Sequence, residues 1–347
     1  MPYLASVSLH RRMAIAALVA ASLAACTAAP PVPGDVATRS LRSPTGSPAH
    51  SPMPISATSA PSESLRGAPP DGQPTWGVVE DPDLAATDGE MRDVVIGGPG
   101  LVAVGGTTNE TEAGRTAIWT SIDGSQWEMV PLEGAAASGR LLSVTPGGPG
   151  FVAVGGECCP DRAAVWISED GQTWQRVQDQ ESFEGAIMTS STPWEGGLVA
   201  VGCVVELECT GTAIWTSGTG LEWERVTLSQ DLGAPYLGDI TSAGEVLVAV
   251  GTTDRDQPGR PAIFVSLDAQ AWTRADVPSV PISLSSVTAG PEGIVAVGTS
   301  LDEVSGQALS LVLTSPDGAT WETVSSDKFA RAVAEDIVVG VDGYVVS

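Results

Sequence analysis

The chain has 347 residues, enough for one large domain or two ordinary ones. Its 40 glycines and 26 prolines favour many turns over long helices. The 42 acidic residues outnumber the 16 basic ones, and the resulting formal net charge of −26 disfavours nucleic acid and flat anionic lipid surfaces as partners.

The first 26 residues have the pattern of an export signal. A basic pair, Arg11 and Arg12, precedes the apolar run 13–25, which is shorter than the ~20 residues that a helix needs to cross a bilayer. The run closes on LAAC, which resembles the bacterial lipobox, where the cysteine thiol receives a diacylglycerol. We therefore predict that residues 1–26 are a lipoprotein signal peptide with its lipobox cysteine, Cys26, as the site of lipidation. The chain would then be anchored to the bacterial cell membrane and face outside, at the cell surface or in the periplasm. The alternative is an ordinary signal peptide with an unrelated cysteine.

Residues 27–70 are dominated by Pro, Ser, Ala and Thr and show no apolar periodicity. Such a composition cannot bury enough apolar surface to offset the entropy of ordering the chain. We predict a disordered, semi-extended tether between the membrane and a folded part that spans residues 71–347.

The folded part repeats itself with a period of about 49 residues. Five tryptophans are separated by 47, 49, 49 and 49 residues, and each unit also carries one copy of a VAVG motif. Four short runs of strand length, rich in Val, Ile, Trp and Thr, follow one another in each unit. Four strands in a repeat of this length are typical of one blade of a β-propeller.

Each repeat contains a turn of the form S-x-D-G-x-x-W or a looser copy of it. The Ser and Asp side chains can bond to nearby backbone groups, and Gly permits the positive φ of a tight turn. This pattern resembles the Asp box, or BNR repeat, of the sialidase-like propellers, although most copies here are one residue shorter. The resemblance implies that the turns join the third and fourth strands of each blade and have a structural role. The residues concerned are Asp123, Trp127, Asp170, Trp174, Trp223, Asp268, Trp272, Asp317 and Trp321.

We therefore predict an all-β protein, a β-propeller of about six four-stranded blades. Five full units run from about 91 to 321, and residues 332–347 match the first two strands of a sixth. Residues 69–79 match the last turn and outermost strand of a unit, so both ends of the folded part would share the closing blade. The alternative is a chain that has been cut short.

The sialidase resemblance raises the alternative of a glycoside hydrolase. Such enzymes need an arginine triad, a Tyr with a Glu as nucleophile and an Asp as acid/base. The family's Phe/Tyr-Arg-Ile-Pro motif is absent, and the nearest place for it is Arg92. Beyond the leader only Tyr236 and Tyr344 remain, and Tyr344 is expected in the core. We therefore favour no catalytic residues, no cofactor and no metal.

Counting back twelve residues from the glycine of each VAVG motif predicts a row of polar residues on the innermost strands. The row consists of Asp93, Ser143, Ser190, Asp239, Ser286 and, in the sixth unit, Asp336. Carboxylates and hydroxyls are ligands for hard cations, so one interpretation is a cation or polar-ligand site. The interpretation that we favour is a solvated channel wall, or residues that bond to backbone groups.

Four cysteines besides Cys26 lie between the second and third strands of neighbouring units. They are Cys158, Cys159, Cys203 and Cys209. The sequence has no C-x-x-C pair here and no nearby His, which disfavours zinc. In an exported chain we predict two disulfides that cross-pair the first two cysteines with the last two.

The leading hypothesis is a monomeric binding module for an unknown protein or glycan, tethered to the membrane by its lipid. Binding would use loops between second and third strands, which differ between units and end in Arg115, Arg162 and Arg260. These arginines would either contact an acidic partner or pair with nearby Asp and Glu. A third hypothesis is a truncated relative without a folded function.

Overall fold

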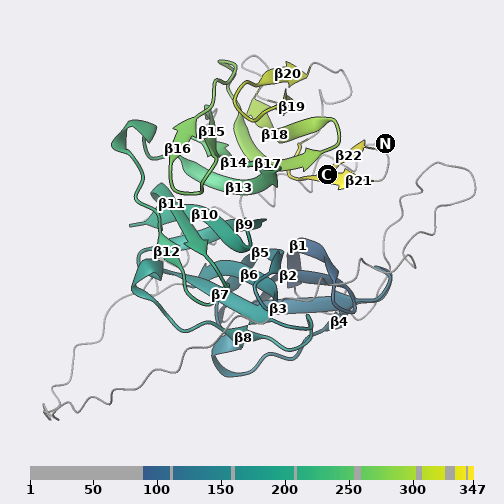
Figure 1. Ribbon diagram of the computed structural model, residues 1–347. Helices are drawn as coiled ribbons and strands as arrows, with labels where there is room; N and C mark the ends of the chain where they lie inside the picture. The colour runs from purple at the N-terminus through teal and green to yellow at the C-terminus, as the bar shows by residue number, and fades with distance from the viewer. Residues whose placement is uncertain are drawn as a thin grey trace, which may run out of the picture. The chain divides into compact units, whose positions relative to one another are not determined.

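A computed structural model describes residues 89–109, 112–157, 161–206, 209–253, 259–301, 307–324, 333–340 and 343–347. These ranges form five four-stranded antiparallel sheets and one two-stranded sheet (Figure 1). The predicted signal peptide, the tether and residues 69–79 lie outside the described residues.

Each sheet is one blade, and its strands follow the order of the chain. Blade one contains β1 (Gly89–Gly97), β2 (Gly100–Asn109), β3 (Glu112–Ser121) and β4 (Glu128–Met129). Blade two contains β5 (Arg140–Gly147), β6 (Gly150–Glu157), β7 (Arg162–Ser168) and β8 (Gln175–Arg176). Blade three contains β9 (Ala186–Trp194), β10 (Gly197–Val205), β11 (Cys209–Ser217) and β12 (Glu224–Arg225). Blade four contains β13 (Tyr236–Ala243), β14 (Val246–Thr252), β15 (Pro261–Ser266) and β16 (Trp272–Arg274). Blade five contains β17 (Ser283–Gly290), β18 (Gly293–Leu301), β19 (Ala308–Ser315) and β20 (Glu322–Val324), and β21 (Ile337–Gly340) and β22 (Gly343–Val346) form the sixth sheet.

Consecutive blades contact each other in chain order, first strand against first strand, from β1 and β5 to β17 and β21. A separate apolar cluster fills each of these interfaces. Between blades two and three, for example, Val154 packs with the fully buried Trp215 and with Trp223. The prediction of a β-propeller with repeated four-stranded blades is therefore confirmed.

The VAVG motif forms the second strand of each blade, and its glycine is required by the strand beside it. Each of the first five inner strands carries a β-bulge just before the residue of the polar row. The bulge brings a backbone carbonyl against the glycine, so that a Cβ on Gly202 would lie 1.9 Å from the carbonyl oxygen of Ile187. The same distance is found at Gly105, Gly155 and Gly251, and it is 2.2 Å at Gly298. The repeated glycine therefore marks a close approach of two backbones.

The repeated turn joins third and fourth strands, as expected, and the hydrogen bonds account for its sequence. In the second blade, Ser168 Oγ accepts from Gly171 N at 2.8 Å. Asp170 Oδ1 accepts from the backbone N–H groups of Gln172 at 2.8 Å and Thr173 at 2.7 Å. The indole of Trp174 donates to the carbonyl of Gly171 at 2.9 Å. Every repeated side chain of the turn is thus used within the turn.

The connections from one blade to the next include three 3-10 helices, η2 (Gly134–Ala137), η3 (Glu181–Phe183) and η4 (Gln230–Leu232). Their buried residues, such as Phe183, close the outer part of the blade interfaces. Within the part of the chain that the structure describes, no helix is long and apolar enough to span a membrane.

Candidate functional site

The predicted polar row exists as a set of hydrogen bonds between blades. At its centre, Asp239 accepts at Oδ1 from Ser190 Oγ of the preceding blade at 2.7 Å and from Ile240 N at 2.8 Å. Its Oδ2 accepts from Val287 N at 2.8 Å and from Ser286 Oγ at 2.9 Å, both in the following blade. One carboxylate therefore links three consecutive blades. Asp239 is partly buried, and this desolvation raises its pKa although its donors act in the opposite direction.

Ser286 lies between two carboxylates of the row. Its Oγ is 2.9 Å from Asp239 Oδ2 and 2.7 Å from Asp336 Oδ1. A hydroxyl has one proton and can donate it to only one acceptor at a time. The Ser286 hydroxyl therefore donates to one of the two carboxylates at a time, and either bond links blade five to a neighbouring blade.

Asp93 repeats this arrangement at the interface of blades one and two. Its Oδ2 accepts from Val144 N of the next blade at 2.8 Å, and its Oδ1 accepts from Val94 N at 2.7 Å. Burial raises the pKa of Asp93 to about 6, the hydrogen bonds from Val144 and Ser143 act against this rise, and the charge of Asp239 adds to it. The Asp residues of the row thus connect neighbouring blades through hydrogen bonds.

Backbone donors occupy part of the acceptor capacity of the row. Both oxygens of Asp93 and of Asp239 already accept hydrogen bonds from backbone N–H groups. Among the described residues no group of three or more His, Cys, Asp or Glu side chains is arranged to hold a metal ion. One lone pair of each of these oxygens is therefore used by a donor of the same blade or of the next one, and the cation interpretation stays an untested alternative.

The raised pKa of Asp93 makes stability depend on pH. The folded protein holds this proton up to about pH 6, whereas an unfolded chain releases it near 3.8. Folding stability should therefore fall as the pH rises from about 4 to about 6, by about 2 kcal/mol after allowance for solvent screening. Urea unfolding of Asp93→Asn between pH 4.5 and 7.5 should show a clearly smaller dependence of stability on pH than the wild type.

The exposed turn residue Asp123 provides the control for this measurement. Hydrogen bonds from the Ser125 side chain and backbone lower the pKa of Asp123, so its contribution is lost only as the pH falls below about 3.8. Asp123→Asn should leave the slope between pH 4.5 and 7.5 unchanged. An Asp93→Asn protein with the slope of the wild type would show that the link between blades does not titrate in this range.

Arg92 and Tyr236, considered above for a hydrolase, lie in the first strands of different blades. Arg92 is the bulge residue of β1, and its Nη2 pairs with Glu90 Oε2 at 3.1 Å on the surface. Tyr236 begins β13. Tyr344, expected in the core, is partly buried against the cluster between blades five and six, and its hydroxyl donates to Gly293 O at 2.8 Å.

The three arginines of the predicted binding rim have different environments. Arg162 pairs with Asp179, which also binds Arg176 at 3.0 Å, and this is the charge pairing that we considered as the alternative to partner binding. Arg115 is exposed beside a backbone bridge to Ser138. Arg260 is exposed, and its carbonyl accepts from Thr253 N at 2.9 Å. Their role in binding stays a prediction.

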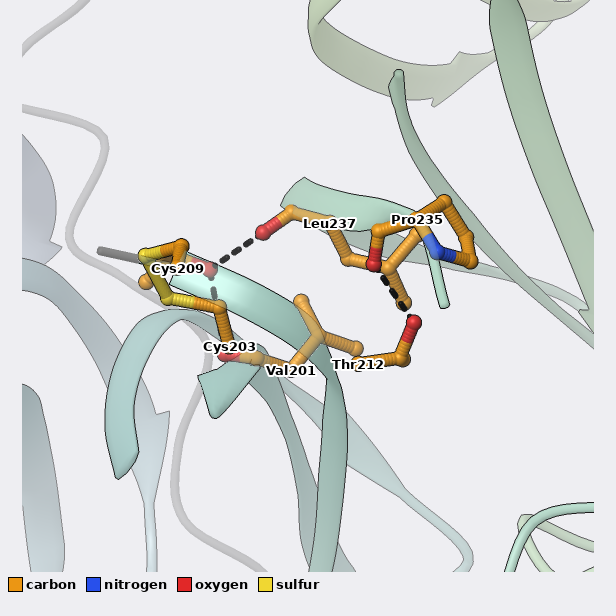
Figure 2. The surroundings of a disulfide bond; sticks show 7 residues. Val201, Cys203, Cys209, Thr212, Pro235 and Leu237 are labelled. Carbon is orange, nitrogen blue, oxygen red and sulfur yellow. Dashed lines mark hydrogen bonds between the residues drawn. A yellow bond between two sulfur atoms is a disulfide. The ribbon is translucent and has the colours of Figure 1, made fainter. Parts of the chain in front are cut away.

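The predicted cross-pairing of the cysteines is wrong for the two that the structure describes. Cys203 and Cys209 form a disulfide with each other across the end of the β10–β11 hairpin, with 5.4 Å between their Cα atoms (Figure 2). They flank a short loop, so hairpin pairing brings them together before any contact between blades is needed. Cys158 and Cys159 lie outside the described residues, and the pairing removes the partners that we expected for them. Close by, Thr212 Oγ1 donates to the Pro235 carbonyl, which links the third strand to the next blade (Figure 2).

A groove that the sequence did not suggest lies at the strand ends opposite to those that carry the predicted rim. It consists of two adjoining hollows of about 340 and 460 Å³, which share Ser242 and Gly244. Turns between first and second strands line both hollows, and the turn at Asp317 lines the larger one. We call this the hairpin groove. Both hollows are shallow and open to solvent.

One turn of the hairpin groove has an unusual backbone. Glu195 adopts a φ of 44°, whereas the corresponding residues of neighbouring blades with positive φ are Gly98, Gly148 and Gly244. Beside it, Trp194 is only 9% exposed, and its indole N–H makes no hydrogen bond in the described part of the chain. The signal was present in the sequence, because WEGG at 194–197 replaces GGPG of the first two blades.

No family model matches the chain, and no curated protein does. Solved structures similar to it include YCF48 bound to D1 peptide, with 17% identity, 72% of each chain covered and a TM-score of 0.46. A streptogramin B lyase structure shows 15% identity over 73% of this chain and 74% of that one, with a TM-score of 0.49. The exo-beta-1,3-galactanase 1,3Gal43A from Clostridium thermocellum shows 12% identity over 69% and 61%, with a TM-score of 0.43. At this level of similarity, none of them assigns a residue role or a ligand to this chain.

Proposed function

We propose that the chain is a membrane-tethered, extracytoplasmic β-propeller of the Asp-box kind that binds a protein or glycan and does not catalyse a reaction. The observation that supports this most is how the repeated polar residues are used. The Asp residues of the turns accept backbone hydrogen bonds within the turn, and the inner Asp93 and Asp239 accept them from the next blade. Side chains committed in this way maintain a scaffold and are poor candidates for acid/base chemistry.

The sequence variation between blades lies in the connections, which is where a rigid scaffold presents recognition residues. The tether and the lipid at Cys26 would hold this scaffold close to the membrane. A lipid anchor raises the local concentration of a binding module near partners in the same envelope, so modest affinity is sufficient there.

Proximity crosslinking in the cell envelope tests this proposal. The wild-type chain should fractionate with membranes and crosslink a defined set of partners. Cys26→Ser removes the proposed acyl acceptor and should release the chain from membranes with the loss of most crosslinks, because the local concentration falls.

The competing hypothesis of a glycoside hydrolase makes the opposite prediction for the purified chain. Turnover of a fluorogenic sialoside that Arg92→Ala abolishes would replace the binding proposal by the enzyme. If the Cys26→Ser protein stayed on membranes, this would contradict the lipid anchor and leave the proposal of a binding module intact.

A further inference from the structure

Blade one carries half of an interface of the kind that joins the other blades. Its apolar cluster consists of Ala103, Ala117 and Trp119, with Met91 packed against them. The residues at the same strand positions of blade two are Ala153, Ala164, Trp166 and Leu141, and all four belong to the cluster between blades one and two. The other half of that cluster comes from the preceding blade and the connection that follows it. A corresponding second half is expected in front of blade one.

The inner strands of blades one and six are exposed where those of the other blades are buried. Val94 follows Asp93 of the polar row and is 53% exposed. Its counterparts are 3 to 5% exposed, and they are Val144, Ile240, Val287 and Ile337. On β21, Val338 is 52% exposed, whereas its counterpart Thr145 is 4% exposed and donates to Ser191 O of the following blade. The described residues therefore leave a seam between blades six and one, and we call Met91, Val94, Ala103, Ala117 and Trp119 the seam face.

The indole of Trp119 shows which kind of group is expected at this seam. The side chain is 1% exposed, and its N–H has no acceptor within the described ranges. At the next interface the indole of Trp166 donates to Ala136 O at 3.0 Å, and at the one after it Trp215 donates to Ser182 O at 2.7 Å. Both acceptors lie in the 3-10 helix of the connection that leads into the blade. A buried donor without an acceptor is costly, so we expect a carbonyl at the same place beside Trp119.

The segment that leads into blade one has the length of the other connections. β1 begins at Gly89, 13 residues after Trp76. The strands β5 and β13 likewise begin 13 residues after the turn tryptophans Trp127 and Trp223. Chain continuity thus brings a connection of the usual length to the start of β1, directly at the seam.

The sequence of this segment also matches the connections at their buried positions. Val79 stands three residues after its tryptophan, as do Val130, Val177 and Val226, each of which is buried in a cluster between blades. The two acceptors Ala136 and Ser182 precede the polar-row residue of their blade by seven and eight residues. The same spacing before Asp93 gives Ala86 and Ala85.

We infer that residues 76–88 of this chain, which lie outside the described residues, dock on the seam face and complete the interface in front of blade one. Val79 adds to the apolar cluster, and the carbonyl of Ala85 or Ala86 accepts from the indole N–H of Trp119. This inference is independent of the proposed function, because it concerns how the scaffold is completed and not what it binds.

Thermal unfolding of the full chain tests this docking at two adjacent valines. Val79→Asp places a charge in the completed cluster and should lower Tm by about 6–10 °C. Val78→Asp is the matched control, because the residues at its position in other blades, Met129, Arg225 and Arg274, are exposed. It should lower Tm by less than about 2 °C. Equal Tm values of the two variants would overturn the inference.

A comparison of two indoles keeps the test valid if Val79→Asp does not fold. Trp119→Phe and Trp166→Phe remove the same atoms from equivalent places, and each should lose one hydrogen bond. Their Tm values should therefore fall by the same amount, within about 2 °C. A Tm of Trp119→Phe at or above that of the wild type would overturn the inference, because the removal of an unpaired buried donor is favourable.

Light scattering distinguishes a second copy as the occupant of the seam face. The wild-type chain should be monomeric, since its own residues 76–88 cover this face. A dimeric wild type that becomes monomeric as Val94→Asp would contradict the docking of residues 76–88 and would assign the seam face to contact between copies.

Discussion

Gly202→Ala should destabilise the propeller by about 3 kcal/mol or more, or prevent folding altogether. The new Cβ would lie 1.9 Å from the carbonyl oxygen of Ile187 and 2.9 Å from the Cα of Met188. Both obstacles are backbone atoms of a bulged strand that is hydrogen-bonded along its length, so neither can move without breaking the pairing of β9 with β10. Urea unfolding followed by tryptophan fluorescence measures the loss.

Gly211 provides the matched control, since it is a glycine of the same blade at which the same substitution to alanine can be made. A Cβ at Gly211 would meet its nearest atoms at 3.7 Å, which is ordinary van der Waals contact. Gly211→Ala should therefore change stability by less than about 1 kcal/mol, with a gain as the expected sign. Similar losses in both variants would show that the close approach of the two backbones does not set the need for glycine.

Asp239→Ala should cost about 3–5 kcal/mol, because it leaves several buried donors in three blades without an acceptor. Ile240 N and Val287 N lose their side-chain acceptor, and the hydroxyl of Ser190 loses its partner at 2.7 Å. Asparagine is not a substitute, since both carboxylate oxygens accept from N–H groups and an amide nitrogen would face one of these donors. We therefore expect Asp239→Asn to lose about 2 kcal/mol or more.

Ser190→Ala is the control for this loss. It removes one donor and leaves the carboxylate with its backbone partners, so we expect a loss of about 1 kcal/mol. The measurement is again urea unfolding, at pH 7.5. An Asp239→Asn protein as stable as the wild type would contradict the view that the carboxylate links the blades.

The fold follows from the sequence because its signals are repeated. The VAVG strands and the Ser, Asp, Gly and Trp of each turn act locally, through strand pairing, positive φ and short-range hydrogen bonds. The period even places Asp93 and Asp239 correctly in one row, since a residue's register in one blade fixes it in the next. Agreement between local and global preferences is what makes such a prediction reliable.

The chemistry of that row does not follow from the sequence. A carboxylate on an inner strand suits both a cation site and a link between blades, and only the position of a neighbouring N–H, such as that of Val287, distinguishes the two. The pairing of Cys203 with Cys209 was missed for a related reason. The spacing of four cysteines allows several connectivities, and the geometry of one hairpin selects among them.

The sequence does not predict the hairpin groove, because the longest and most variable connections lie elsewhere in the blades. The two hollows lie among short turns that look interchangeable in sequence, and the turns of blades four and five carry an acidic residue as well, Glu245 and Glu292. What sets Glu195 apart from those two residues is its φ of 44°, which the sequence does not report. Ala269 likewise stands where the other copies of its turn have glycine, and it holds a φ of 60°.

The bulge opposite each VAVG glycine also limits how the gene can change in length. The distance from the inner polar residue to its glycine is twelve residues in each of the five complete blades, from Asp93 and Gly105 to Ser286 and Gly298. The distance between successive turn tryptophans, in contrast, varies between 47 and 49. A codon gained or lost inside the first hairpin would turn the remaining side chains of that strand to the wrong face, whereas one in an outer connection would pass almost unnoticed. Insertions and deletions in the descendants of this chain should therefore accumulate outside the inner hairpins, and whole blades should be duplicated or deleted more readily than single residues within them.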